Sequence, residues 1–250
     1  MPLVLALHGF GGTSAFIEQY LQFRPLAEER GFIYALPEGT LNELGQQFWN
    51  ATDACCGTNS TIDDATYLRA VIDDLQAKLV VDPQRIFIVG HSNGGFMAYK
   101  MACEHADVIA AIVSLAGATF IDPADCTPSE PVSVLQVHGT ADDVIYFDGG
   151  TYNGPSPYPS AMQTAQTWSA YDECKEVGEL TPFDPDPDLA GDEASIVSYV
   201  VCDNNATVEL WIMEGNDHAP IPTTSMVSLI DFLFAHPKAL LESPRQPRYL

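Results

Sequence analysis

Residues Ile86 to Lys100, IFIVGHSNGGFMAYK, combine an apolar run, a glycine-flanked serine and a segment typical of a helix. A short continuous apolar run such as Ile86 to Val89 predicts a strand that is buried on both faces. The pentapeptide from Gly90 to Gly94 matches G-x-S-x-G, a sharp strand-to-helix turn that lifts the serine hydroxyl above the sheet edge. The pentapeptide alone is a weak signal. In its strand-turn-helix context, Ser92 is better interpreted as a nucleophile than as a polar residue in an ordinary turn.

Apolar runs alternate with helical segments along the rest of the chain, which predicts a mostly parallel sheet covered on both faces. We find no linker and no internal repeat, so residues 1–250 are predicted to form a single α/β domain. The segment PLAEER, which starts at Pro25, is predicted to be a helix closed by Gly31, and Thr61 is predicted to cap another helix. The expected strands are 3–7, 32–36, 86–89, 109–115, 132–137, 196–201 and 208–213, and three further helices are expected at 93–103, 160–171 and 224–234.

The composition excludes several partner classes. The 250 residues are 46% hydrophobic, yet no apolar run approaches the roughly 20 residues that span a bilayer, which predicts a soluble protein with no membrane partner. Lys and Arg number 10 against 34 Asp and Glu, a formal net charge of −24 that repels phosphate backbones. Nucleic acid is therefore not expected as a partner, and we interpret the acidity as a solubility feature.

A serine hydroxyl is a weak nucleophile, so it needs a base, and the base needs an orienting acid. On this type of fold the chain order is Ser, then Asp or Glu, then His. His218 fits the base, because EGNDHAP directly follows the expected strand 208–213; the alternative is a solvated loop histidine. The other histidines fit less well. Chain order excludes His8 and His91, and His105 follows Ser92 too closely. His138 lies at a strand end, and His236 lies near the C-terminus.

The acid is expected in HGTADDVI, which follows strand 132–137 and lies at the same sheet edge. Asp142 is favoured, because adjacent side chains diverge and Asp142 has the usual position in an HGxxD turn. Asp143 would then be a solvated or helix-capping neighbour, and Asp148 is a third candidate.

The glycine-rich stretch HGFGG follows the first strand, where the backbone that binds an oxyanion should lie. We assign the N–H groups of Phe10 and Asn93 as the two oxyanion donors. A phosphate cradle is not supported, because neither GxGxxG nor GxxxxGK[ST] is present.

Two weaker signals concern substrate and metal binding. Trp49 and Asn50, in the loop sequence FWNATD, either shape a substrate pocket or belong to a packed surface aromatic cluster. Asp184, Asp186 and Asp188 alternate as in a calcium loop, but Leu189 and Ser195 stand where that loop requires Gly and Glu. A solvated acidic loop is favoured, and no metal or other cofactor is predicted.

The six cysteines form an even set without zinc-ligand spacing, which favours disulfides and an oxidising compartment. The first residues, MPLVLALHGF, do not have the charged and cleavage regions of a signal peptide. The start of the chain is therefore expected to be a truncation.

Five segments together resemble the α/β-hydrolase esterases grouped with polyhydroxybutyrate depolymerases and feruloyl esterases. They are LHGFGG, FWNATDACC, DPQRIFIVGHSNGGFMAYKMACE, VSVLQVHGTADDVIYFDGG and EGNDHAP, and the resemblance extends from Leu3 to about Phe234. It implies an α/β-hydrolase fold and a secreted or periplasmic serine esterase without metal or organic cofactor. Ser92, Asp142 and His218 occupy the triad positions. Because the oxyanion motif already begins at His8, the N-terminal edge strands of that fold are expected to be missing.

The resemblance also implies a disulfide between Cys174 and Cys202. Three pairings of the other four cysteines remain open; Cys55 and Cys56 are adjacent, so we expect them to bind different partners, such as Cys103 and Cys126. The family's GGGH followed by Trp-Pro reads GNDHAP here. The missing tryptophan predicts a more open pocket on the alcohol side.

The sequence therefore predicts a serine esterase for small or oligomeric esters, of short-chain or aromatic, feruloyl-like acids. A polyester depolymerase of the polyhydroxybutyrate type is the alternative. A peptidase has less support, since no substrate-gating domain is evident. A non-catalytic binding protein on the same fold would predict a broken triad, whereas every role has a candidate. The sequence does not predict the oligomeric state.

Overall fold

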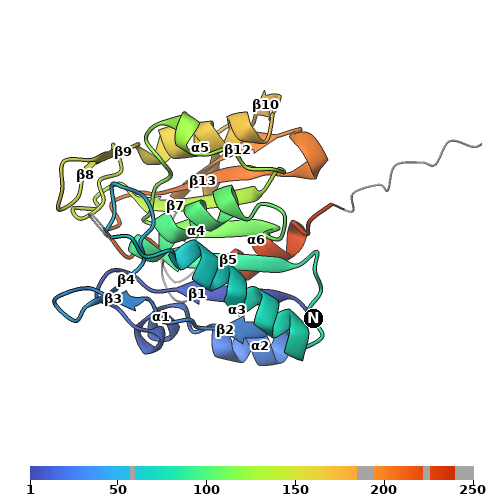
Figure 1. Cartoon of the computed structure of the whole chain (residues 1–250). Coiled ribbons are helices and arrows are strands. Elements are labelled where there is room, and N and C mark those ends of the chain that lie inside the picture. The colour runs from blue at the N-terminus through green and yellow to red at the C-terminus, as the bar shows by residue number, and fades with distance from the viewer. Residues whose placement is uncertain (57–59, 185–193, 222–225, 240–250) are drawn as a thin grey trace, which may run out of the picture.

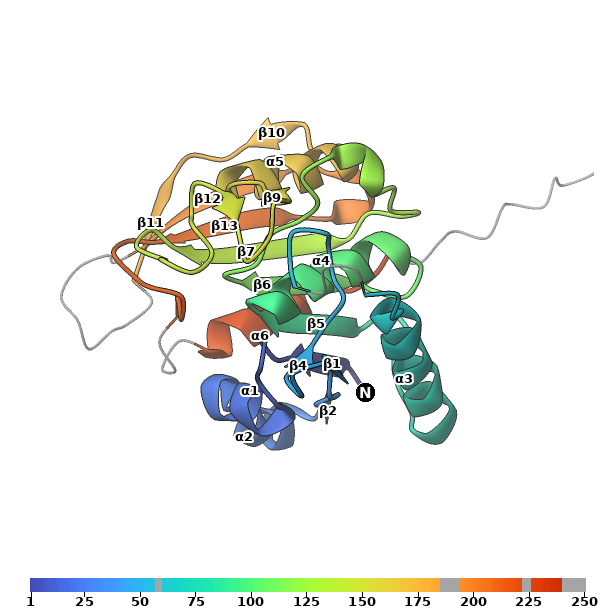
Figure 2. The same ribbon diagram turned by 60° about the vertical axis from the view of Figure 1, so that its left-hand side comes forward.

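The computed structural model describes residues 1–56, 60–184, 194–221 and 226–239. A twisted sheet runs through the molecule, with helices on both faces (Figures 1 and 2). Its strand order is β10-β12-β13-β7-β6-β5-β1-β2; neighbours from β13 to β2 are parallel, β12 is antiparallel to β13, and β11 pairs with β12. The strands are β1 Leu3–Leu7, β2 Ile33–Ala35, β5 Ile86–His91, β6 Ala111–Leu115, β7 Ser133–Gly139, β10 Glu176–Val177, β11 Thr181–Phe183, β12 Ala194–Val200 and β13 Val208–Met213.

Two apolar cores lie on opposite faces of this sheet. Successive strand side chains point to opposite faces, so Leu5 of β1 enters one core and Val4 enters the other. Both faces of β1, β5, β6 and β7 are buried, as expected for parallel strands. The first core is covered by α3 Asp64–Lys78, α4 Asn93–Glu104 and α5 Ala161–Tyr171, and the second by α1 Ser14–Leu21, α2 Phe23–Arg30 and α6 Met226–Ala235.

The mostly parallel sheet and the helices on both faces confirm the predicted fold class. Gly31 closes α2 with φ 69°, as expected from the sequence. The predicted helix cap at Thr61 is wrong: Asp63 caps α3, because its side chain accepts a hydrogen bond from the amide of Thr66. At the edge of the described sheet, the outermost strand beside β1 is β2. Asp186 and Asp188 of the acidic loop, and the expected start of the last helix at Thr224, lie outside the described residues.

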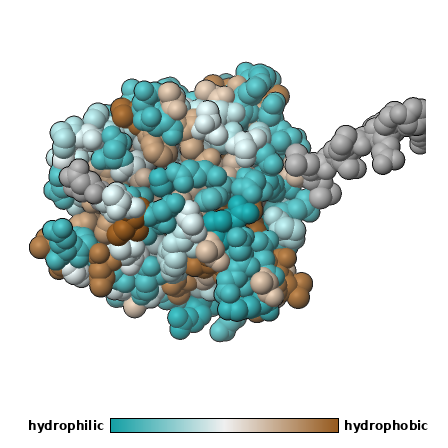
Figure 3. Space-filling view, in the orientation of Figure 1, coloured by the Kyte–Doolittle hydropathy of each residue, from teal (hydrophilic) through white to brown (hydrophobic). Residues whose placement is uncertain are grey.

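Several short elements have no predictive pattern in the sequence. They are α1 and two small hairpins, formed by β3 Thr40–Leu41 with β4 Gln47–Phe48 and by β8 Gly150–Thr151 with β9 Pro157–Tyr158. Figure 3 shows hydrophilic side chains over most of one face, with apolar patches at the end of the molecule where β3 and β4 lie. Leu41 and Leu44 of that hairpin are 61% and 82% exposed. No helix in the described ranges is both long and apolar enough to cross a bilayer.

All six cysteines are paired in disulfides. Cys174 is joined to Cys202, as the family resemblance implied. The expectation that Cys55 and Cys56 have different partners is wrong, because they are joined to each other. Cys103, at the end of α4, is joined instead to Cys126 in the segment after β6, where the fold brings their Cα atoms to 5.6 Å.

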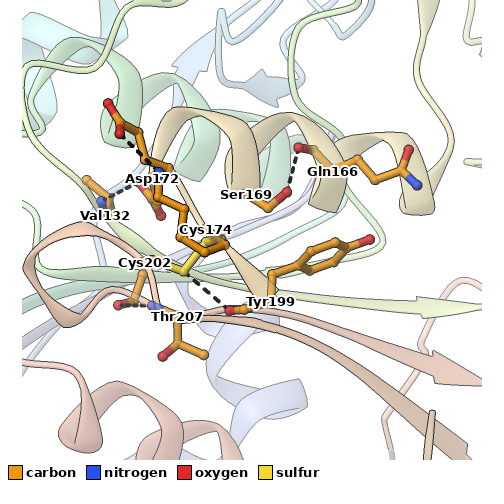
Figure 4. Close-up of a disulfide and its surroundings, with 11 residues drawn as sticks. Val132, Gln166, Ser169, Asp172, Cys174, Tyr199, Cys202 and Thr207 are labelled. Carbon is orange, nitrogen blue, oxygen red and sulfur yellow. Dashed lines mark hydrogen bonds and ion pairs between the residues drawn. A yellow bond between two sulfur atoms is a disulfide. The ribbon is translucent and has the colours of Figure 1, made fainter. Parts of the chain in front are cut away.

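A buried carboxyl group lies beside the Cys174–Cys202 disulfide (Figure 4). Asp172 follows α5 and is fully buried; its Oδ1 accepts a hydrogen bond from the amide of Val132 at 3.1 Å, while its Oδ2 has no partner in the described part of the chain. Burial raises the pKa of Asp172 to about 8; the Val132 hydrogen bond opposes this shift and the charge of Asp203 adds to it. The folded protein therefore keeps a proton on this side chain at neutral pH.

Asp172 should make stability depend on pH. Between the unfolded pKa of about 4 and the folded value, the folded chain binds a proton that the unfolded chain releases, so the free energy of unfolding falls as pH rises. Asp172→Asn should remove most of this decline. Urea denaturation of wild type and variant at about pH 5 and about pH 8 measures it, with exposed Asp53→Asn as the control. Equal pH slopes in wild type and Asp172→Asn would contradict the assignment.

Candidate active site

Ser92 occupies a strained turn between β5 and α4. Its φ of 55° is unusual for a residue with a side chain, and its amide donates to the Leu115 carbonyl at 2.8 Å. Two glycines make the turn possible. A Cβ on Gly90 would lie 2.0 Å from the Gly94 carbonyl oxygen, and one on Gly94 would lie 2.2 Å from that of Leu7. The backbones of β5, α4 and β1 are therefore in direct contact around the serine.

Three side chains that are distant in sequence form one hydrogen-bonded chain. His218 Nε2 lies 2.9 Å from Ser92 Oγ, and His218 Nδ1 lies 2.8 Å from Asp142 Oδ2. The carboxylate accepts, so we assign the imidazole hydrogen to Nδ1, which leaves Nε2 free to accept the serine hydroxyl. The loops after β5, β7 and β13 supply the three residues, because the carboxyl ends of parallel strands meet at one edge of the sheet.

Asp142 is the buried member of this chain. Burial opposes its ionisation, but hydrogen bonds from His138 and His218 outweigh that effect and hold the pKa of Asp142 well below its usual range. Its Oδ1 also accepts from the amides of Val144 and Ile145, each at 2.9 Å. The two other candidate carboxylates, Asp143 and Asp148, are exposed. The structure thus brings Asp142 to His218, as the HGxxD position predicts.

His91, next to the serine, holds the loop of His218. Its Nε2 lies 2.7 Å from the His218 carbonyl oxygen, and the two rings are 5.0 Å apart. Burial, together with positive charge on His218, lowers the pKa of His91 to about 4. At neutral pH His91 is therefore uncharged and donates a hydrogen bond to the backbone of the loop.

The glycine-rich loop after β1 lies against the serine. A Cβ on Gly9 would be 3.3 Å from Ser92 Cβ, and the amide of Gly11 donates to the Gln47 carbonyl at 2.7 Å. The loop and the serine border an open cavity of about 370 Å³. Its lining residues are Gly9, Phe10, Gly11, Gly12, Phe16, His91, Ser92, Val144, Tyr152 and His218. Of the two predicted oxyanion donors, Phe10 is on the cavity wall and Asn93 is the first residue of α4.

Trp49 is fully buried between this loop and α4. Its Nε1 donates to the His8 carbonyl at 2.9 Å, and its backbone makes two hydrogen bonds with the Asn93 carboxamide, at 2.7 and 2.8 Å. The amide of Asn50 donates to Asp64 Oδ2 at 2.6 Å. Neither Trp49 nor Asn50 is on the cavity wall, so a direct substrate contact for them stays a prediction.

Sequence reasoning did not identify three side chains of the cavity wall, Phe16, Val144 and Tyr152. Phe16 is a large apolar side chain on α1, yet it is 55% exposed. The sequence does not show which apolar side chains of a helix stay exposed, so this signal comes only from the structure. Within the described ranges, no three His, Cys, Asp or Glu side chains are grouped so that they could hold a metal ion.

Comparison with known proteins gives one family match, to the prolyl oligopeptidase family over residues 19–143. NocK of Nocardia uniformis subsp. tsuyamanensis is 33% identical over 178 residues, which are 68% of this chain and 50% of that protein. Feruloyl esterase B of Piromyces equi is 29% identical over 225 residues, 87% of this chain and 39% of that protein. The chain thus spans half or less of the length of these relatives.

Among solved structures, the acetyl xylan esterase from Aspergillus awamori superimposes with a TM-score of 0.70. The match covers 93% of this chain and 88% of that one at 15% sequence identity. At this identity the likeness concerns the fold alone.

The Asn93 side chain should contribute strongly to stability. Asn93→Ala leaves the buried amide of Trp49 without a partner and removes one of the two hydrogen bonds to its carbonyl, which the Ala51 amide also reaches at 3.0 Å; the free energy of unfolding should fall by about 1–3 kcal/mol. Chemical denaturation measures the loss. The exposed helical variant Gln19→Ala is the control, with an expected change within about 0.5 kcal/mol. Equal stability of the two variants would show that the Asn93 contacts are dispensable.

Proposed function

The chain belongs to the prolyl oligopeptidase family and has the α/β-hydrolase fold, and from this premise we propose that it is a serine esterase that hydrolyses carboxylic esters. The observation that carries the proposal is the position of His218 between Ser92 Oγ and Asp142 Oδ2, at 2.9 and 2.8 Å. The esterase name of the Piromyces relative also supports it.

In the proposed reaction, Ser92 Oγ attacks the ester carbonyl while His218 Nε2 takes its proton. Asp142 stays ionised, keeps the imidazole hydrogen on Nδ1 and stabilises the imidazolium. The tetrahedral intermediate then expels the alcohol, which receives the proton from His218, and an acyl-serine remains. Water attacks this ester with His218 again as base, and the carboxylic acid leaves.

The oxyanion is proposed to bind to the backbone N–H groups of Phe10 and Asn93. Phe10 is on the cavity wall beside Ser92, and the amide of Asn93 is at the positive N-terminal end of α4. Loss of one such donor costs roughly 3 kcal/mol of barrier in comparable enzymes, so this backbone is central to the proposed rate.

We assign the substrates as short-chain or aromatic, feruloyl-like esters. Phe10, Phe16 and Tyr152 give the 370 Å³ cavity three aromatic side chains, which suit a planar aromatic group. The second candidate is a polyester, favoured by the exposed Leu41 and Leu44 on the hairpin that is hydrogen-bonded to the glycine-rich loop. The family name also makes a peptidase the third candidate.

Three disulfides fit a secreted or periplasmic protein, and this location is part of the proposal. The net charge of −24 favours neutral ester substrates over anionic ones and argues against nucleic acid.

A hydrolysis panel tests the proposed activity. It consists of p-nitrophenyl esters of increasing chain length, methyl ferulate, hydroxybutyrate oligomers and peptide amides. Wild type should hydrolyse the first two classes, and Ser92→Ala should lose at least about 10³-fold in kcat, because the nucleophile is gone. Faster cleavage of peptide amides than of any ester would contradict the esterase assignment.

Substitution separates the two adjacent carboxylates. Asp142→Ala should lower kcat by about 10³- to 10⁴-fold, since His218 loses the group that fixes its hydrogen. Asp143→Ala is the matched control, because this side chain is exposed, and it should retain wild-type turnover. Steady-state kinetics on p-nitrophenyl acetate measure both, and the reverse order would transfer the role to Asp143.

Tyr152 should contribute to selectivity for aromatic groups. Tyr152→Ala should lower kcat/KM for methyl ferulate about tenfold and leave methyl butyrate nearly unchanged, because the small aliphatic acyl group does not need this wall. Tyr67→Ala, a 42% exposed tyrosine on α3, is the control. An equal loss on both esters would argue against a pocket for the aromatic group at Tyr152.

A further inference from the structure

A second buried imidazole contacts Asp142 and has no role in the proposed reaction. His138 is 1% exposed and lies in β7, four residues before Asp142. Its Nε2 is 2.7 Å from the Ile145 carbonyl oxygen and 3.4 Å from Asp142 Oδ2. The ring is therefore placed to donate one hydrogen toward both oxygens, provided that this hydrogen is on Nε2.

Gln136 and the Ile145 carbonyl, on opposite sides of the ring, both favour this position of the hydrogen. The Tyr99 hydroxyl donates to Gln136 Oε1 at 2.7 Å, which fixes the orientation of the carboxamide. The Nε2 of Gln136 then donates to the Gly117 carbonyl at 2.8 Å and to His138 Nδ1 at 3.0 Å. Because Nδ1 accepts this bond, the single ring hydrogen of a neutral His138 must be on Nε2. Tyr99 and Gln136 are fully buried, so water does not compete for these bonds.

Both carboxylate oxygens of Asp142 therefore have hydrogen-bond donors around them. Oδ1 is occupied by the amides of Val144 and Ile145, and Oδ2 lies between the rings of His218 and His138. Phe147 packs edge-on against the His138 ring, with centroids 5.8 Å apart. A carboxylate held at both oxygens cannot rotate away from His218 when the imidazolium forms and discharges.

We propose that Tyr99, Gln136 and His138 form a relay that fixes the hydrogen of His138 on Nε2 and thereby aims the Asp142 carboxylate at His218. The three are positioning residues, since none touches the cavity where substrate would bind. The inference rests on the proposed function, because it assigns Asp142 as the acid that orients His218.

Two amide substitutions of His138 distinguish a positioning role from a role in packing alone. In His138→Gln the side-chain amide reaches the place of Nε2 and can still donate to Asp142, whereas in His138→Asn it reaches only the place of Nδ1. The p-nitrophenol burst counts the active sites, so that kcat can be given per active site. This kcat should stay within about threefold of wild type in His138→Gln and fall about 10- to 100-fold in His138→Asn. KM should change little in both. A purely structural role predicts equal losses in both variants or fewer active sites at unchanged kcat, and either result overturns the relay.

The hydrogen position can be measured without turnover. Long-range ¹H–¹⁵N spectra of histidine-labelled wild type should show His138 protonated on Nε2 and not on Nδ1. In Gln136→Leu the Nδ1 resonance should move, because Nδ1 loses its hydrogen bond while the Ile145 carbonyl still accepts from Nε2. A wild-type His138 protonated on Nδ1 overturns the relay. This spectrum tests the relay even in a protein that cleaves no ester, whereas absence of hydrolysis by wild type contradicts the proposed function.

Discussion

The direct contact between the backbones of β1, β5 and α4 at Gly90 and Gly94 is the constraint on which the site depends. It forces Ser92 into a conformation with φ 55°, which costs of order 1–3 kcal/mol at an isolated residue. Pairing of β5 with β1 and β6, and helix formation from Asn93 onward, hold the strained turn in place. The hydroxyl therefore projects from a fixed point at the sheet edge, and the neighbouring loops have to pack around it.

Two buried hydrogen-bond networks lie on either side of this turn. On one side, hydrogen bonds of Trp49 to Asn93 and to the His8 carbonyl connect the glycine-rich loop to the first turn of α4. On the other side, Asp142 collects hydrogen bonds from its own loop and from two imidazoles, which keeps a carboxylate ionised in a buried place. Each polar atom in these networks has a partner, so burial does not carry the full desolvation cost.

The sequence predicts the sheet, most helices and the three residues of the hydrogen-bonded chain, because each depends on local patterns. Apolar runs specify buried strands, and motif order places Ser92, Asp142 and His218 after strands of one sheet edge. The cavity wall is not predictable in this way: Phe16 and Tyr152 reach it through α1 and the β8–β9 hairpin, whose positions depend on tertiary packing. The disulfides show the same limit, since Cys55 and Cys56 pair with each other although their adjacency suggested separate partners. Trp49 looked like a surface or pocket residue, yet its indole is part of the buried network.

The central claim is that Ser92 is a nucleophile activated by His218 and Asp142. The most direct test is labelling with a fluorophosphonate, followed by mass spectrometry of the peptides. The account predicts one adduct, on the peptide that contains Ser92, absent from Ser92→Ala and formed much more slowly in Asp142→Ala. No adduct in wild type, or an adduct that persists in Ser92→Ala, would contradict the account.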